Sequence, residues 1–114
     1  MDPCNHPTNA LLFRYSALTF NGHRIHYDLP YARDVEGYPG LVVQGPLTAT
    51  LLVHEAERHI LGRHVSSIHY SGIQPIFAEA ELMLAGSRTE EHEAILWAEN
   101  EAGARCAEVL IGPA

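Results

Sequence analysis

The chain has 114 residues, of which 46% are hydrophobic and 18% are charged, so it is long enough for one domain with a buried core and too short for two. Fourteen acidic residues oppose seven basic ones, all of them arginine, and the formal net charge of −7 argues against a surface that binds nucleic acid. No apolar run approaches the roughly 20 residues of a membrane span, and the N-terminus lacks the pattern of a signal peptide. We therefore expect a soluble, cytoplasmic protein with no membrane contact, in which Cys4 and Cys106 are free thiols.

The chain is predicted to begin with an irregular arm and a short helix. Two prolines fall within residues 1–9, which we interpret as the arm, and residues 10–114 are interpreted as the single domain. Apolar residues recur at helical spacing over residues 10–19, directly after the candidate capping residues Thr8 and Asn9. The spacing therefore predicts a first helix over 10–19.

A long loop and a central helix are predicted next. Residues 20–40 are rich in glycine, proline, histidine and tyrosine, which favours a functional loop with one helical turn at 31–35. Pro46 suits the first position of a helix, and apolar residues cover most faces of the following turns until Gly62 ends the pattern. A helix that is apolar on most sides is expected to be wrapped by other elements.

The second half of the chain is predicted to form about four antiparallel strands. Alternating or β-branched residues mark strands at 64–70, 76–84, 92–99 and 105–111, although the alanines and glutamates of the second run suit a helix equally well. Residues 100–103 are interpreted as a turn that joins the last two strands in a hairpin. These elements indicate the α+β class, with a sheet curled around one helix.

The chain has eight histidines, so a metal site is the first possibility to consider. The segment from His54 to His59 is similar to the helix that binds zinc in zinc proteases, in which two histidines four residues apart lie on one face. His54 and His59 are five residues apart, so their side chains would point about 140° away from each other around the helix. We therefore expect no metal site and no cofactor. His23 and His26 lie in a loop dense in groups that transfer or orient protons, so they are candidates for acid–base catalysis, with chance placement as the alternative.

Gly45 is the second candidate feature because it stands at the start of the predicted central helix. Free amides and the helix dipole at such a position can polarise a carbonyl oxygen or hold an anion. The alternative interpretation is a sharp helix entry at Gly45 and Pro46. A loop histidine that faces a helix N-terminus would form a minimal site, in which a proton carrier faces an oxyanion hole.

Three separated blocks of the sequence resemble the MaoC-like hydratases and dehydratases of the hot dog fold. The similarity is greatest to the branch that contains mesaconyl-CoA hydratases, itaconyl-CoA hydratases and 3-hydroxyacyl-thioester dehydratases. The matching stretches are 12–28, 31–32 together with 36–47, and 68–77, within an overall likeness from 11 to 111. The resemblance implies a single hot dog domain, with an antiparallel sheet around a central helix and a short N-terminal strand region. It also implies addition or removal of water across the 2,3 double bond of an enoyl thioester.

The resemblance assigns roles to individual residues. In the hydratase motif G-D-x-N-P-x-H, the histidine position is taken by His26, the aspartate position by Asn21 and the asparagine position by His23. His26 would then carry the proton, and Asn21 would only orient the water or the ring because an amide cannot accept a proton. Gly45 matches the glycine whose amide donates to the thioester oxygen, and Thr50 matches a hydroxyl residue that lines the pocket.

Other positions bear on the substrate. Tyr31, Gln44 and His23 join Thr50 as candidate substrate-binding residues. Two residues depart from the branch, since Gln44 replaces the usual histidine before the glycine and Ser71 replaces a common arginine. Arg24, Arg33 and Tyr31 favour a short acyl group that carries a carboxylate, although loop arginines are more often solvated.

The resemblance also implies partners and leaves alternatives open. The expected substrate is an acyl-CoA or acyl-carrier-protein thioester, and the expected assembly is a homodimer or a heterodimer of hot dog units. One alternative is a hot dog acyl-CoA thioesterase, for which Glu55 or Glu57 would supply the carboxylate. Another is a non-catalytic subunit that completes a partner's acyl tunnel, which the departures at Gln44 and Ser71 and the expected lack of a first strand favour.

Overall fold

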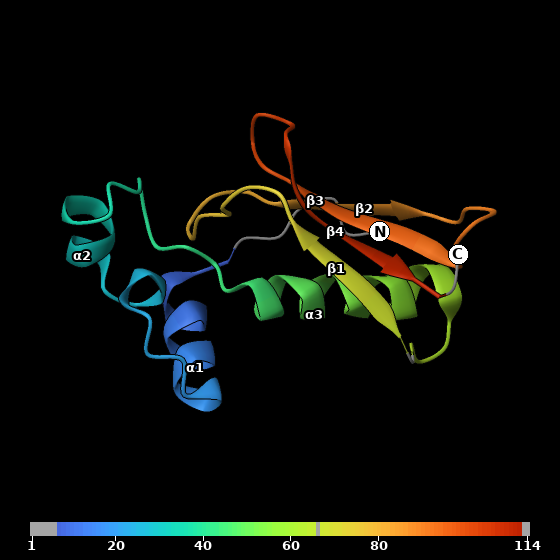
Figure 1. Ribbon diagram of the computed structural model, residues 1–114, viewed down its shortest axis with the longest axis horizontal. Coiled ribbons are helices and arrows are strands. Elements are labelled where there is room, and N and C mark those ends of the chain that lie inside the picture. The colour runs from blue at the N-terminus through green and yellow to red at the C-terminus, as the bar shows by residue number, and fades with distance from the viewer. Residues whose placement is uncertain (1–6, 66, 113–114) are drawn as a thin grey trace.

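A computed structural model describes residues 7–65 and 67–112. In it, one face of a four-stranded antiparallel sheet packs against a long helix, and a group of short helices lies beyond the N-terminal end of that helix (Figure 1). The elements in chain order are α1 (Asn9–Thr19), η1 (Arg24–His26), α2 (Leu29–Asp34), α3 (Gly45–Ala56), η2 (Glu57–Leu61), β1 (Ile68–Gly72), β2 (Met83–Ser87), β3 (Ala94–Glu99) and β4 (Arg105–Ile111). None of the helices within the described ranges has the length and apolar character of a membrane span.

Helix α1 confirms the prediction for residues 10–19. The Oγ1 atom of Thr8 accepts a hydrogen bond of 3.1 Å from the backbone N–H of Leu11, as expected of a capping threonine. The helix ends at Phe20, whose φ of 55° is left-handed. Leu12 and Ser16 form its buried face. Most of the arm expected at residues 1–9, including Cys4, lies outside the described residues.

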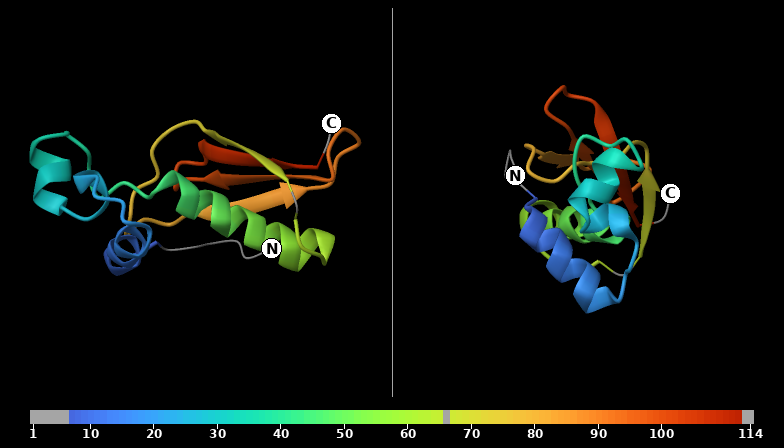
Figure 2. Two further views of the ribbon diagram at one scale, coloured as in Figure 1. Left: turned by 60° about the horizontal axis from the view of Figure 1, so that its bottom comes forward. Right: turned by 90° about the vertical axis from the view of Figure 1, so that its left-hand side faces the viewer.

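The loop at 20–40 contains two short helical pieces, η1 and α2, of which α2 corresponds to the turn predicted at 31–35. Helix α2 begins two residues earlier than predicted because Asp28 caps it, accepting a 3.1 Å hydrogen bond from the backbone N–H of Tyr31. The sequence contains this cap as an aspartate just before Pro30, a combination typical of a helix start. These two pieces, together with α1, form the lobe at one end of the molecule (Figure 2).

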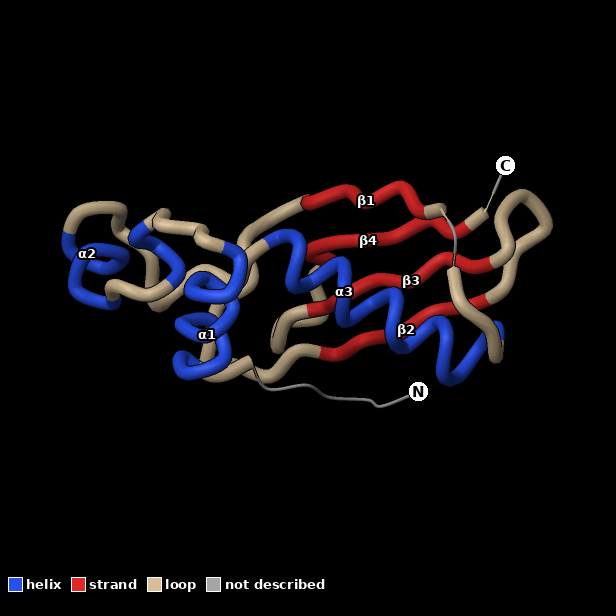
Figure 3. Tube along the Cα trace, turned by 90° about the horizontal axis from the view of Figure 1, so that it is seen from below, coloured by secondary structure: helices blue, strands red, loops and turns tan. Residues whose placement is uncertain are grey.

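Helix α3 confirms the predicted central helix and continues into the single π-helical turn η2. Pro46 stands in its first turn, and Gly62, with a φ of 66°, ends the helical segment as expected. Leu47, Leu52 and Ala56 are among its buried residues. The expected wrapping is one-sided within this chain, since α3 lies across one face of the sheet (Figure 3), and Thr50 and His54 on the helix are exposed.

The sheet has the strand order β1-β4-β3-β2, so β1 and β2 are its edges (Figure 3). The predicted hairpin of β3 and β4 is confirmed, and the side-chain Oδ1 of Asn100 accepts hydrogen bonds of 3.0 Å from the backbone N–H groups of Ala102 and Ala104 in its turn. Strand β1 begins four residues later than the strand predicted at 64–70. In β3 every second residue is buried against α3, which matches the alternation in the sequence.

The strand predicted at 76–84 is wrong over most of its length. Strand β2 begins only at Met83, and the preceding segment is irregular apart from isolated bridge residues, which include the antiparallel pair of Val42 and Phe77. Glu79 has a φ of 63°, which no regular strand accommodates. The alternating apolar residues Ile76, Ala78, Leu82 and Leu84 are buried and Ala80 is half-buried, but they face the core from a bent segment.

Candidate active site

The imidazole of His26 is held by the segment that leads into α3. His26 closes the 3₁₀ turn η1 and is buried, and its Nδ1 lies 2.6 Å from the backbone oxygen of Val42. Since a carbonyl oxygen only accepts hydrogen bonds, Nδ1 carries the hydrogen and Nε2 of the neutral ring keeps its lone pair. Burial lowers the pKa of His26, the hydrogen bond to Val42 partly offsets this effect, and the neighbouring His23 adds to it. The ring is therefore a neutral proton acceptor near pH 7.

Asn21 and His23 belong to the same loop as His26. The Oδ1 atom of Asn21 accepts a 3.2 Å hydrogen bond from the backbone N–H of His23, which forms a local turn directly after α1. The ring centroids of His23 and His26 are 5.5 Å apart, with their planes at 84°. The structure therefore brings together the three loop residues singled out in the sequence. Asn21 shapes the backbone between them, His23 is exposed and His26 is buried.

Gly45 is connected to this loop through the short segment before α3. The backbone N–H of Val42 donates to Ile25 O at 2.9 Å, and that of Val43 donates to Ile76 O at 2.8 Å. Because Gly45 follows Val42 by three residues, their Cα atoms are at most about 11 Å apart. The residue before α3, Gln44, makes no capping hydrogen bond with its side chain, so it does not occupy the amides of the first turn. The carbonyl that holds His26 and the amide end of α3 are therefore parts of one small region.

Gln44 is fully buried, and its side chain joins α1 to α3. Its Nε2 donates to the backbone oxygen of Leu12 at 2.9 Å and to the hydroxyl oxygen of Ser16 at 2.8 Å. Its Oε1 is also buried and has no hydrogen-bond partner among the described residues. The amide expected to bind substrate is thus committed to the contact between the two helices. Thr50 is exposed, and its hydroxyl donates to the backbone oxygen of Pro46 at 2.8 Å.

The polar side chains of the loop contact one another. Arg24 pairs with Asp28 at 2.9 Å, and its guanidinium carbon lies 4.2 Å from the centroid of the Tyr31 ring. The hydroxyl of Tyr31 donates to Glu36 at 3.3 Å, and Arg33 donates to the backbone oxygen of Pro39 at 3.2 Å. Each candidate for contact with a substrate carboxylate therefore already has a partner within the loop.

Ser71 lies on β1 in register with Glu108 of β4, whereas its neighbour Tyr70 pairs with Val109. Val109 is fully buried on the face that packs against α3. Since directly paired residues share a face of the sheet, Ser71 and Glu108 point to the opposite face. The departure from the family pattern at Ser71 therefore lies away from α3.

The carboxylates of the central helix lie far from its N-terminus. Glu55 and Glu57 follow Gly45 by ten and twelve residues, which corresponds to about 15 and 18 Å along a helix axis. Glu55 is buried 3.4 Å from Nε2 of His59. Glu57 accepts a 2.8 Å hydrogen bond from the backbone N–H of Val65, which lowers its pKa. Within one chain, neither carboxylate reaches the amide end of α3.

Tyr70 is a residue near the site that the sequence did not indicate. A Cβ atom built on Gly45 would lie 3.7 Å from the Tyr70 hydroxyl oxygen, so the phenol stands beside the first residue of α3. The sequence signals were its place in the matching stretch 68–77, which assigned it no role, and the alternation of β1, which places Tyr70 on the inner face of the sheet. The 25 residues between Gly45 and Tyr70 carry no local pattern that pairs them.

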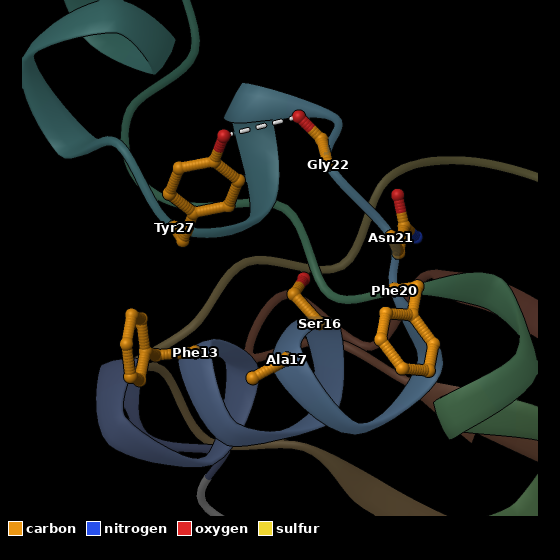
Figure 4. A pocket seen from close by; sticks show the side chains of 7 residues that line it. All are labelled: Phe13, Ser16, Ala17, Phe20, Asn21, Gly22 and Tyr27. Atoms are coloured by element: carbon orange, nitrogen blue, oxygen red, sulfur yellow. Dashed lines mark hydrogen bonds between the residues drawn. The ribbon is translucent and has the colours of Figure 1, made fainter.

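A pocket of about 350 Å³ opens between α1 and the loop that carries Asn21, Gly22 and Tyr27 (Figure 4). Figure 4 shows the hydroxyl of Tyr27 donating to the backbone oxygen of Gly22 at 3.1 Å on the rim. The lining is mostly apolar and consists of Phe13, Ser16, Ala17, Phe20, Asn21, Gly22 and Tyr27. His26 and Gly45 do not line it, so this pocket is next to the candidate catalytic loop rather than at its centre.

The model of the family described as hydroxyacyl-thioester dehydratase type 2 matches residues 2–78. The chain belongs to this family. It is 54% identical over 78 residues to the mesaconyl-C(4)-CoA hydratase of Chloroflexus aurantiacus, a match that covers 68% of this chain and 28% of that protein. The chain thus spans about a quarter to a third of the length of that relative.

Solved structures share the fold at low sequence identity. An (R)-hydratase from A. caviae superposes with a TM-score of 0.78 at 18% identity, covering 95% of this chain and 87% of that one. A C-terminally truncated HadBC complex from Mycobacterium tuberculosis, a 3R-hydroxyacyl-ACP dehydratase, gives a TM-score of 0.78 at 12% identity, covering 97% and 90%. These matches confirm the expected hot dog fold.

Proposed function

We propose that the protein is a carbon–oxygen lyase that adds water to, or removes it from, the 2,3 double bond of an enoyl thioester. The observation that carries this proposal is the 2.6 Å hydrogen bond from Nδ1 of His26 to Val42 O. It orients a buried, neutral imidazole whose Nε2 is free to take a proton, close to the amide end of a helix. Membership of the dehydratase family supports the same reaction.

In the hydration direction, Nε2 of His26 removes a proton from water as the water oxygen bonds to C3 of the acyl group. The electron pair of the double bond moves toward the thioester, whose oxygen takes up negative charge and accepts a hydrogen bond from the Gly45 amide. The imidazolium then returns its proton to C2, so the hydration consumes one water and leaves the enzyme unchanged. Asn21 holds the turn that carries His23 and His26, and the reverse sequence removes water.

The family relationship supports proposals for the substrate class, the assembly and the cellular location of the protein. We propose an acyl-CoA or acyl-carrier-protein thioester as substrate, and a short dicarboxylic acyl group such as mesaconyl as the first to test, because the Chloroflexus relative is named for it. The dehydratase from Mycobacterium tuberculosis is a HadBC complex. By analogy, we propose that this chain assembles as a homodimer or heterodimer of hot dog units. A cytoplasmic location also remains a proposal.

The geometry disfavours the thioesterase alternative. Hydrolysis by the expected route needs a carboxylate beside the oxyanion site, but Glu55 and Glu57 stand about 15 and 18 Å along α3 from Gly45. A non-catalytic subunit would have the same fold and bind its partner without turnover. The departures at Gln44 and Ser71 no longer favour that alternative, since Gln44 is buried between helices and Ser71 lies on the outer face of the sheet.

The test measures both reactions of the full chain on crotonyl-CoA and mesaconyl-CoA, following the enoyl absorbance for hydration and free thiol for hydrolysis. We expect hydration without thiol release, and a loss of about 10²–10⁴-fold in His26→Ala. His64→Ala is the matched control, because the His64 side chain is fully exposed near Glu57, at the other end of α3. Thiol release without hydration, or unchanged hydration in His26→Ala, would refute the assignment, and a folded but inactive wild type would indicate the non-catalytic subunit.

A further inference from the structure

One edge of the Tyr70 ring lies against two glycines, Gly45 at the first position of α3 and Gly72 in β1. A Cβ on Gly45 would be 3.7 Å from the Tyr70 hydroxyl oxygen and 3.8 Å from its Cε2, and a Cβ on Gly72 would be 3.7 Å from each of the same two atoms. The same edge of the phenol therefore faces both glycines. Because neither glycine has a side chain, neither residue covers this edge of the ring, which carries the hydroxyl, with a side chain of its own.

The hydroxyl of Tyr70 is available as a hydrogen-bond donor. The hydroxyls of Tyr27 and Tyr31 donate to Gly22 O and Glu36 Oε1, whereas no acceptor among residues 7–65 and 67–112 receives a hydrogen bond from Tyr70. Burial raises the pKa of Tyr70, so the phenol keeps its proton throughout the physiological range. A half-buried phenol that is always protonated can donate to an oxygen atom but cannot act as a base.

The position of this hydroxyl fits a shared acceptor. Standard bond geometry places a Cβ about 2.5 Å from the nitrogen of its own residue, so the Tyr70 oxygen is at most about 6 Å from the Gly45 nitrogen. One oxygen atom that accepts hydrogen bonds of about 3 Å from both groups spans that distance. Pro46 has no N–H, so the next amide of the helix cannot serve as this second donor.

We propose that Tyr70 is a substrate-binding catalytic residue whose hydroxyl donates a second hydrogen bond to the thioester oxygen held by the Gly45 amide. This inference rests on the proposed function. The phenol and the amide together form a two-donor oxyanion site, in which strand β1 supplies one donor and α3 the other. Such a site stabilises the negative charge that develops on the thioester oxygen when water adds at C3.

The experiment compares wild type with Tyr70→Phe, which keeps the ring on both glycines and removes only the hydroxyl. Two non-reacting ligands separate its roles: butyryl-CoA, which has the thioester oxygen, and S-butyl-CoA, a thioether that lacks it. We expect Tyr70→Phe to bind butyryl-CoA about 5-fold more weakly and S-butyl-CoA equally well, the difference that one neutral hydrogen bond makes. The infrared carbonyl stretch of bound butyryl-CoA, labelled with carbon-13 at C1, should shift to higher frequency in the variant. In turnover, kcat should fall by about 10²-fold.

Tyr38→Phe is the control, because the Tyr38 ring packs against Phe77 rather than against Gly45 or Gly72. It should change neither the ligand affinities nor the carbonyl frequency. Equal weakening of both ligands by Tyr70→Phe, or an unchanged carbonyl frequency, would overturn the inference while leaving the proposed hydratase activity intact. A wild-type chain that binds neither ligand and does not hydrate enoyl-CoA would overturn the inference together with the proposed function.

Discussion

The Nδ1 atom of His26 lies 2.6 Å from the backbone oxygen of Val42, three residues before the first residue of α3. This contact fixes the tautomer of the ring, since the carbonyl requires a hydrogen on Nδ1. It also connects the loop after α1 to the N-terminus of the central helix. The acceptor is a backbone oxygen, so the contact depends on the path of the backbone before Gly45 rather than on the side chain of residue 42.

The pKa of His26 predicts the pH dependence of activity. Burial lowers this pKa from its ordinary value of about 6.5, so the neutral ring dominates at pH 7 and becomes protonated only in more acidic solution. We expect kcat/KM for hydration to rise with pH through the lowered pKa and to level off around neutral pH. The measurement is a pH–rate profile together with an NMR titration of the His26 ring. A rate that still rises tenfold per pH unit above 7 would contradict the assignment.

The same shift predicts how stability depends on pH. The folded state binds a proton at His26 less readily than the unfolded state does. The contribution of neutral His26 to the free energy of unfolding is therefore complete above about pH 6.5, and it is lost as the pH falls through the lowered pKa. His26→Gln, which cannot titrate, should flatten the free energy of unfolding in that window. Urea denaturation at several pH values measures this, and equal slopes for both proteins would exclude a contribution from His26.

Asn21 is expected to act through the turn it forms. Asn21→Ala removes the acceptor of the 3.2 Å hydrogen bond from the His23 N–H and should destabilise the protein by about 1 kcal/mol. Asn21→Asp keeps an acceptor at the same position and should be close to wild type in stability. We expect activity to fall in Asn21→Ala and to persist in Asn21→Asp, measured by hydration assays beside thermal denaturation. Equal loss in both variants would mean that the amide N–H₂ group, rather than the turn, is needed.

Local signals in the sequence predicted the elements that are stabilised locally. The cap at Thr8, the left-handed glycine at Gly62 and the turn at Asn100 each act within a few residues, and the corresponding helices and hairpin are confirmed. The failure at 76–84 has a tertiary cause. Hydrogen bonds from Val43 to Ile76 O and from Glu79 to Pro7 O hold this segment against distant parts of the chain.

The site was predicted only in part for the same reason. His26 was singled out by its loop and Gly45 by its place at a helix start, the family motif only assigned their expected roles, and the structure connects the two residues through Val42. Neither the buried hydrogen bonds of Gln44 nor the contact of Tyr70 with Gly45 has a sequence signature, because their partners lie 25 or more residues away. Long-range pairs of this kind require the folded backbone.

Gln44 is expected to matter for stability more than for substrate binding. Gln44→Ala leaves the Leu12 and Ser16 acceptors without their donor and opens a cavity, which should reduce the free energy of unfolding by about 3 kcal/mol. Gln44→Met keeps most of the volume and removes the unpartnered Oε1, so it should cost only about 1–2 kcal/mol. Urea denaturation measures both. A Met variant that is folded and stable but inactive would instead show a role for the amide in catalysis.

Glu79 connects the irregular segment before β2 to the start of α1 by hydrogen bonds. Two substitutions separate the effect of its carboxylate from that of its left-handed backbone. Its backbone N–H donates to Pro7 O at 2.6 Å, its carboxylate accepts a 2.7 Å hydrogen bond from the Asn9 N–H, and its φ of 63° is unfavourable for any residue with a Cβ. Glu79→Ala removes the carboxylate and keeps the unfavourable backbone, so we expect a loss of about 1–2 kcal/mol in the free energy of unfolding. Glu79→Gly removes the same carboxylate but tolerates the left-handed conformation, so it should be about 0.5–1 kcal/mol more stable than Glu79→Ala despite the greater flexibility of glycine in the unfolded chain. Denaturation midpoints of the two variants test this order, and an alanine variant more stable than the glycine variant would show that residue 79 does not adopt the left-handed conformation in solution.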